Sequence, residues 1–340
     1  MINLLSDTIT KPSVAMLEAM MNAKVGDDVF GADPTANELQ AKIASIFGME
    51  DALFFPSGTM ANQVAIKLHT NPGEQLICDK WAHVYNFEGG GVASNSGVSC
   101  FLIDGERGMF TAAQVEKVIN DPHNIHIATT TLVSIENTTN KGGGACWNFS
   151  EIKKIKDICT ENNLAFHLDG ARLFNALIAK NEDPKAYGQQ FDAISICLSK
   201  GLGAPIGSLL LGTKAHIKKA LRLRKRFGGA MRQVGYLAAA GIYALDNNVS
   251  RLAEDHLKAK KIGDVLHKLS FVKFVEPIET NIVIFNLMDT IDESDFIETL
   301  KKNKVLIASM GSGKSRMVTH LDFTDEMLDE LLKILQSLKF

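Results

Sequence analysis

Residues 164–203 read LAFHLDGARLFNALIAKNEDPKAYGQQFDAISICLSKGLG, and this stretch decides the fold class. Two short apolar runs of strand type end in it, one at the acid Asp169 and one at the amine Lys200. Glycines follow the lysine at positions 201 and 203. In α/β sheets, ligands bind beyond the carboxyl ends of the strands. The pattern therefore predicts an α/β protein with an acid and a lysine at its ligand site.

These two residues indicate a particular chemistry. A lysine flanked by small residues can form a Schiff base, and a carboxylate can pair with a pyridinium nitrogen. Those are the two protein groups that pyridoxal phosphate chemistry requires. A lone Lys-Gly is usually a surface turn and a lone Asp-Gly a hairpin. Because both follow strands and occur in this order, the functional interpretation is favoured.

Composition is typical of a globular enzyme, with 46% hydrophobic and 22% charged residues. The length of 340 residues predicts about two domains, or one large domain with a smaller appendage. A net charge of −3 gives no electrostatic reason to bind nucleic acid or an anionic membrane. The first residues lack a basic start and a long apolar run, so neither a signal peptide nor a membrane span is predicted. Five scattered cysteines without a CxxC pair predict reduced thiols in a cytosol and no zinc site.

Helical and strand patterns alternate along the chain, which predicts a mostly parallel sheet. A strand rich in Thr and Ile is predicted at 125–136, and an apolar strand, antiparallel or at a turn, at 207–212. From about residue 250 the pattern changes to that of a smaller α+β domain. The predicted division is an N-terminal arm (1–12), a large cofactor-binding domain (13–245) and a small C-terminal domain (246–340).

Three other features are candidates for the site. Ser57, Gly58 and Thr59 follow a predicted strand and open a helix, whose free N–H groups would suit a phosphate, although an ordinary N-cap is equally expected. His83 follows the next strand and could stack on a heteroaromatic ring or act as acid or base, although a surface histidine is the commoner case. Arg232 stands after a glycine pair at the start of an apolar helix and could face an anion.

The run Gly311–Ser315 looks like the end of a nucleotide-binding P-loop but lacks its other features. That loop needs a glycine six positions before its lysine, and Ala308 stands there. It also opens a helix, whereas the residues after Ser315 have a strand pattern. A nucleotide-binding function is therefore not predicted.

Taken together, the motifs of this chain resemble those of the low-specificity L-threonine aldolases, fold type I pyridoxal phosphate enzymes related to the β-eliminating lyases. HLDGAR, LSKGLG and the opening SDT are the most diagnostic. The matching segments run nearly from end to end: LLSDTITKPSVAML (4–17), VGDDVFGADPT (25–35), FFPSGTMANQVA (54–65), AHVYNFEGGG (82–91), SIENTTN (134–140), HLDGARLFNA (167–176), ICLSKGLGAPIGSLL (196–210), GGAMRQVGYLAAAGIYAL (228–245) and VTHLD (318–322).

The resemblance implies roles for the matching residues. Lys200 would bond to the cofactor aldehyde, Asp169 would keep the pyridine nitrogen protonated, and His83 would stack on the ring near the substrate hydroxyl, which His126 would also approach. The base that takes the hydroxyl proton is left open between the two histidines and a water held by them. Residues implied to hold the cofactor are Lys200, Asp169, Arg172, Ser57, Gly58, Thr59, His83 and, across a subunit boundary, Arg232. Residues implied to hold the substrate are Ser6, His83, His126, Arg172 and Arg316.

Two positions depart from the family pattern. Thr139 stands where the family usually has a histidine, and Phe30 where it commonly has a tyrosine. Neither position bonds to the cofactor, so the reaction class is retained while side-chain preference and rate are put in question.

The resemblance also implies a fold and a reaction. The fold is a mostly parallel seven-stranded central sheet flanked by helices, with a smaller C-terminal α+β domain. The reaction is the reversible cleavage of L-threonine, L-allo-threonine and other β-hydroxy-α-amino acids to glycine and an aldehyde. The alternatives are a β-eliminating lyase, a glycine hydroxymethyltransferase and, outside catalysis, a cofactor carrier or interaction protein. A cytoplasmic homo-oligomer, a dimer of dimers, is expected.

Overall fold

A seven-stranded sheet forms the centre of the chain, and the computed structural model describes all 340 residues. Its strands are β2 (Asp51–Phe55), β3 (Gln75–Asp79), β4 (Ser99–Ile103), β5 (Thr130–Glu136), β6 (Ala165–Gly170), β7 (Ala193–Cys197) and β8 (Ser208–Gly212). They lie in the order β2-β8-β7-β6-β5-β3-β4, and only β8 runs antiparallel to its neighbours. The predicted mostly parallel seven-stranded sheet is confirmed, and so is an antiparallel strand near residues 207–212.

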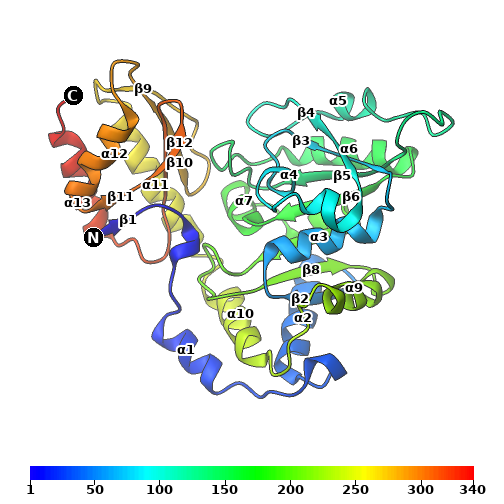
Figure 1. Cartoon of the computed structure of the whole chain (residues 1–340). Helices are drawn as coiled ribbons and strands as arrows, with labels where there is room; N and C mark the ends of the chain where they lie inside the picture. The colour runs from blue at the N-terminus through cyan, green and yellow to red at the C-terminus, as the bar shows by residue number, and fades with distance from the viewer.

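Helices cover both faces of this sheet, as Figure 1 shows. On one face lie α3 (Gly58–His69) and α9 (Lys214–Arg226), and on the other α2 (Pro34–Phe47) and α6 (Phe149–Glu161). Because the strands are covered on both faces, they are nearly continuous apolar runs. The other segments of this part are η1 (Asp7–Ile9), α1 (Val14–Met21), η2 (Asp28–Phe30), α4 (His83–Asn86), the π-helical η3 (Val92–Ser96), α5 (Ala112–Glu116), α7 (Leu173–Lys180), α8 (Pro184–Gly188) and α10 (Gly235–Asn247).

The C-terminal part has its own sheet and its own apolar core. Its antiparallel sheet has the order β12 (Ala308–Gly311), β13 (Lys314–Val318), β10 (Ile282–Leu287), β9 (Val272–Val275). Its helices, yellow to red in Figure 1, are α11 (Leu252–Leu266), α12 (Glu293–Lys302) and α13 (Asp325–Ser337). This is the predicted α+β part; the exact division at residues 245–246 stays a prediction, and it falls near the end of α10. No helix of the chain combines the length and the apolar character needed to cross a bilayer.

The first residues belong physically to the small part. Strand β1 (Ile2–Asn3) pairs in parallel with β11 (Val305–Leu306), and the side chains of Ile2 and Leu4 are buried in the small core. Figure 1 accordingly shows both termini on the side of the small domain. The predicted N-terminal arm is therefore tied down at its start by the C-terminal domain.

Strand order fixes where a ligand can bind. From β3 the chain goes outward to β4, and then returns to place β5, β6 and β7 on the other side of β3. A reversal of this kind leaves a crevice beyond the carboxyl ends of the strands flanking it, here β3 and β5. His83 follows β3 and Glu136 ends β5, so both lie at this point.

Two predictions about local structure have different outcomes. The strand predicted at 125–136 is wrong over its first five residues, since 125–129 form a loop in which the Ile125 side chain is 92% exposed. Apart from one bond from the N–H of Gln75 to the Thr129 carbonyl, strand β3 pairs with this segment only from Thr130 onward, so residues 125–128 have no strand partner. Rejection of a P-loop is confirmed, because residues 311–313 have positive φ and turn the chain between β12 and β13.

Gly207 directly precedes β8, the antiparallel strand of the large sheet, and a substitution there tests how tightly this turn is packed. Its φ is 119°, and a Cβ atom there would lie 2.6 Å from Cε2 of Phe54. We expect Gly207→Ala to destabilise the protein by about 2 kcal/mol or more, since backbone strain and overlap add. Gly228→Ala is the matched control, because φ is 79° there and the space around it is open. This variant should lose only about 1–2 kcal/mol of unfolding free energy, from backbone strain alone. If urea unfolding gave the same loss of stability for both variants, the overlap with Phe54 would contribute nothing to the cost at Gly207.

Candidate active site

One cavity lies at the carboxyl edge of the seven-stranded sheet and has a volume of about 230 Å³. Six of the predicted site residues line it, contributed by α3, α4, β6 and the turn after β7. The sequence prediction that an acid and a lysine share one ligand site therefore agrees with the geometry. The lining residues are Pro56, Ser57, Gly58, Thr59, Asn62, His83, Asp169, Ala171, Cys197, Ser199, Lys200, Pro205 and Ile206.

One end of the cavity is the start of α3. Ser57 is the N-cap, and its Oγ accepts a hydrogen bond from the N–H of Met60 at 3.2 Å. The N–H groups of Gly58 and Thr59 precede the first helical acceptors, so they are open to an anion at the positive end of the helix. A Cβ atom on Gly58 would lie 2.6 Å from Cys197 Sγ, so glycine is needed for the close approach. This corner fits a phosphate group.

Asp169, near the end of β6, lines the cavity. Its Oδ2 accepts from Asn62 Nδ2 at 2.9 Å, and its Oδ1 accepts from the N–H of Ala171 at 3.1 Å. The amide of Asn62 is oriented by its oxygen, which accepts from Ser195 Oγ at 2.6 Å and lies 3.3 Å from His167 Nε2. The carboxylate is thus held in one orientation, as pairing with a pyridinium nitrogen requires.

His83 lines the same cavity and is held by two acids. Its backbone N–H donates to Glu136 Oε2 at 3.2 Å, and its Nδ1 lies 2.9 Å from Glu88 Oε1. Burial lowers the pKa of His83, but the bond to Glu88 and the charges of Asp169 and Glu136 outweigh it, so that the pKa is raised overall. These surroundings favour the protonated form of the ring relative to a free imidazole.

Glu136 faces Asp169 across neighbouring strands, since the two are paired in the β5–β6 register. Burial, and then the negative charge of Asp169, raise the pKa of Glu136 to about 7. Its oxygens accept the N–H groups of His83 and Asn140. His83, Glu88 and Asp169 also place potential metal-ligand atoms within 4.8 Å of one another, but hydrogen bonds to protein N–H donors account for this cluster.

Lys200 lies in the turn after β7, as predicted, and its side chain reaches the cavity. The turn is fixed by the bond of Gly203 N–H to the Lys200 carbonyl at 2.8 Å, and Gly203 has a φ of 78°. Thr10 Oγ1 of the arm donates to the same carbonyl at 3.2 Å. The cavity therefore offers an amine that can bond to the aldehyde of the cofactor, in the same space as an acid and a corner that fits a phosphate.

Arg172 is buried next to this site, where its side chain is engaged by an acid of the arm. Its Nε and Nη2 donate to the two oxygens of Asp7 at 2.8 and 2.7 Å, and Asn281 of the small domain donates to the same carboxylate at 3.2 Å. Burial alone would raise the pKa of Asp7, but Arg172 lowers it to about 2. This edge of Arg172 is thus closed to a substrate carboxylate, and only its remaining nitrogen is left for the predicted roles.

Arg316 on β13 keeps one nitrogen, Nε, without a partner. Its two Nη atoms donate to Asn140 Oδ1 at 3.0 Å and to the Leu5 carbonyl at 3.1 Å, while its buried Nε has no partner. Burial and the nearby Arg172 guanidinium lower the pKa of Arg316. The negative charge of a bound carboxylate would oppose this effect and stabilise the charged guanidinium. Ser6 follows Leu5 directly, so the prediction that Ser6 and Arg316 share a substrate-binding corner fits the geometry.

Two predicted residues lie apart from both this cavity and the corner around Arg172 and Arg316. His126 lies in the exposed loop before β5, at the amino end of that strand and hence at the opposite edge of the sheet. Arg232 pairs with Asp27 at 2.8 Å and is 56% exposed. The expected contact of His126 with the substrate hydroxyl is therefore not made within one chain, and Arg232 needs the subunit boundary that was predicted for it.

The two departures from the family pattern lie in different surroundings. Thr139 is buried with its Oγ1 unpartnered, packed against the backbone of Gly108. Phe30 is 80% exposed, and the Arg232 guanidinium lies 6.0 Å from its ring centroid. Phe30 therefore belongs to the surface around Arg232, outside the cavity.

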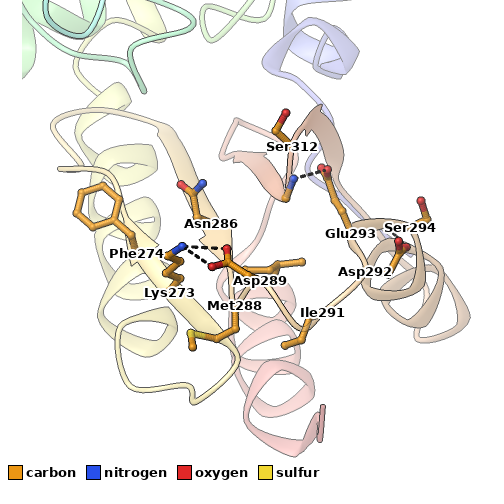
Figure 2. Close-up of a pocket in the computed structure, with 12 residues that line it drawn as sticks. Lys273, Phe274, Asn286, Met288, Asp289, Ile291, Asp292, Glu293, Ser294 and Ser312 are labelled. Atoms are coloured by element: carbon orange, nitrogen blue, oxygen red, sulfur yellow. Dashed lines mark hydrogen bonds and ion pairs between the residues drawn. The ribbon is translucent and has the colours of Figure 1, made fainter.

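A larger hollow of about 650 Å³ lies in the small domain, away from Lys200 (Figure 2). The polar groups that Figure 2 joins are already paired: Lys273 Nζ with the two oxygens of Asp289 at 2.8 Å, and Glu293 Oε2 with the N–H of Gly313 at 3.2 Å. It contains no lysine–acid–histidine set, so the smaller cavity is the candidate active site.

Fold, lysine, acid and phosphate corner together define a fold type I pyridoxal phosphate enzyme. A sequence model of the β-eliminating lyase family matches residues 3–290. The chain is 45% identical to the low-specificity L-threonine aldolase of Escherichia coli K12 over 97% of both chains, and 37% identical to that of Candida albicans over 98% of this chain and 89% of the relative. A solved threonine aldolase of Leishmania major has the same fold, with a TM-score of 0.86, 21% identity and 99% of each chain covered. The chain belongs to the β-eliminating lyase family and, within it, to the low-specificity L-threonine aldolases.

Several residues of the site were not predicted. Asp7, Glu88, Glu136 and Asn140 lie in the quoted motifs SDT, NFEGGG and SIENTTN, and Asn62 lies one turn into the helix that Ser57 caps. Their presence in those motifs was a signal. Their roles depend on contacts between elements distant in sequence, which spacing alone does not reveal.

The Asp7–Arg172 pair yields a stability prediction. Asp7→Asn leaves a buried guanidinium without its anion, so we expect a loss of about 3–5 kcal/mol at pH 7 in urea unfolding. Because the folded pKa of Asp7 lies below the unfolded value of 3.8, its stabilisation is fully present above that value and is lost as the pH falls toward 2. The difference between wild type and variant should therefore narrow below about pH 4.

Asp246→Asn is the control for this measurement. Asp246 pairs with Lys42 at 2.6 Å but is 48% exposed, so the change should cost less than about 1 kcal/mol. A loss at Asp7 no greater than at Asp246 would show that the buried pair contributes nothing special to stability.

Proposed function

We propose that this chain cleaves L-threonine and L-allo-threonine, and other β-hydroxy-α-amino acids, to glycine and an aldehyde in a reversible reaction of threonine breakdown and glycine formation. The observation that carries the proposal is the convergence of Lys200, Asp169 and His83 on one cavity in a chain so similar to named aldolases. Both the phosphate corner and the unpartnered Nε of Arg316 fit the groups such a reaction must bind.

The residues divide the work as follows. Bound pyridoxal phosphate supplies a ring that accepts the electron pair released when the substrate's Cα–Cβ bond breaks. Lys200 would hold the cofactor, Asp169 would keep a proton on the ring nitrogen, and the start of α3 would bind the phosphate. Arg316, beside Ser6, would orient the substrate carboxylate. These assignments rest on the distances given above and on the matching motifs.

We further propose His83 as the group that takes the proton from the β-hydroxyl, directly or through a water. It lines the cavity, and its Nε2 has no protein partner, whereas His126 of the same chain lies in an exposed loop. His126 would then reach the hydroxyl only in another subunit's site. His83→Phe with an undiminished cleavage rate would rule out His83 as the base.

Changes at Lys200 and Asp169 test the proposed chemistry. Lys200→Ala should abolish both the visible absorbance of the covalently held cofactor and cleavage of threonine. Asp169→Asn should lower kcat by about 10²-fold or more while cofactor binding is weakened less, because an amide cannot hold the ring nitrogen protonated. Acetaldehyde released from threonine without folate supports the aldolase. Ammonia with a keto acid would instead identify a β-eliminating lyase, and a folate requirement a glycine hydroxymethyltransferase.

We propose that the chain works as a cytoplasmic homo-oligomer, a dimer of dimers, divided as predicted into arm, large domain and small domain. Support for association comes from large exposed apolar side chains near the start of the chain, and from Arg232 and His126, whose proposed partners lie in another subunit. These apolar residues are Val14, Leu17, Met21 and Phe30. Free cysteines support a reducing compartment. Sedimentation of the purified protein should give a mass of about four chains; a monomer that cleaves threonine at full rate would contradict the shared site.

A further inference from the structure

Glu88 is a buried carboxylate to which the proposed mechanism gives no task. Its side chain has no exposed surface. Three donors meet it: His83 Nδ1 at 2.9 Å and Asn62 Nδ2 at 2.9 Å on Oε1, and Gln63 Nε2 at 2.6 Å on Oε2. Burying a carboxylate is costly without such partners. The three donors therefore indicate surroundings built to hold the Glu88 side chain in one place.

The contact with Glu88 decides which nitrogen of His83 carries hydrogen. An ionised carboxylate only accepts hydrogen bonds, so Nδ1 must be the donor. The other nitrogen, Nε2, has no protein partner, and 29% of the side chain is exposed where His83 lines the cavity. The neutral ring therefore presents an unprotonated Nε2 to the substrate, which is the form a base needs.

The same carboxylate is linked to Asp169, the acid proposed to pair with the ring nitrogen of the cofactor. Asn62 donates through one nitrogen to both Glu88 and Asp169, and its oxygen is held by Ser195. The charged or titratable groups around His83 are thus Glu88 on its own segment, Asp169 on β6 and Glu136 on β5. Of these, only Glu88 bonds to the imidazole itself; Glu136 bonds to the backbone N–H.

We propose that Glu88 is a positioning residue that fixes the orientation and tautomer of His83, so that Nε2 faces the β-hydroxyl of the substrate. The proposal rests on the function of His83 proposed above. In this role Glu88 touches neither substrate nor cofactor, and it acts only through its hydrogen bond to His83 Nδ1.

Three variants separate charge from geometry. Glu88→Gln keeps an acceptor for Nδ1 but removes the charge, Glu88→Leu removes both, and Glu88→Asp keeps the charge on a shorter side chain. In protein with ¹⁵N-labelled histidine, with and without cofactor, His83→Phe identifies the His83 signals. We expect Nδ1-protonated His83 in wild type, the same tautomer with a lower pKa in the Gln variant, a mixture of tautomers in the Leu variant, and near wild-type signals in the Asp variant.

Kinetics with threonine give the second readout. We expect kcat to fall about 10-fold or more in the Leu variant with KM little changed, because Glu88 does not touch the substrate. In the Gln variant the acidic limb of the kcat/KM profile should move to lower pH. Glu276→Gln is the matched control: Glu276 pairs with Lys314 in the small domain at 3.2 Å, and its loss should leave the His83 signals and the profile unchanged.

The outcomes distinguish this proposal from the proposed function. Unchanged His83 tautomer and pKa in both the Leu and Gln variants would overturn the role of Glu88, whatever the activity. If the Leu variant does not fold, the Gln and Asp variants decide by the pKa of His83 alone. A wild-type enzyme that releases no aldehyde from threonine would overturn the proposed function, and the nitrogen spectra would then decide by themselves whether Glu88 orients His83.

Discussion

Two carboxylates, Glu136 and Asp169, face each other at the ends of adjacent strands, and much of the site follows from having to accommodate them. The register of β5 and β6 brings them together without regard to their charge. Burial, and then the like charge of Asp169, make ionisation of Glu136 unfavourable and raise its pKa to about 7. Relief comes from N–H groups of the surrounding segments: Asn140 and His83 for one acid, Asn62 and Ala171 for the other. One of these donors is the backbone N–H of His83, so the need to stabilise Glu136 also fixes the position of that residue.

A second constraint acts between the domains. Asp7 accepts from Arg172 of the large domain and Asn281 of the small one, while Arg316 of the small domain donates to Asn140 and to the arm at Leu5. The arm therefore lies between two bodies and is bonded to both. The corner proposed to bind the substrate carboxylate exists only where all three segments meet, whereas the cavity proposed for the cofactor is built from the large domain alone.

The parts that follow from local pattern could be predicted. Asp169 and Lys200 were located because a strand that ends at a polar residue leaves a direct mark in sequence, and Ser57 because capping has a short-range rule. The loop at 125–129 was missed because isoleucines alternate with polar residues there as in a strand, and only the lack of a pairing partner shows otherwise. Glu88 and Asp7 could not be given roles, since their partners lie on other elements. His126 and Arg232 were predicted only from the family resemblance, and since neither lines the cavity of its own chain, their proposed roles depend on assembly.

The pairing of β1 with β11 has a consequence for synthesis. Ile2 and Asp7 are made long before Val305 and Asn281, the residues of the small domain that hold them. A nascent chain can complete its seven-stranded sheet and bond Asp7 to Arg172 while Ile2 still lacks the strand with which it pairs. The corner proposed for the amino acid's carboxylate is thus completed only once β13 and its Arg316 have been made, so a chain truncated before β13 would keep the cavity proposed for the cofactor but lose the arginine proposed to bind the substrate.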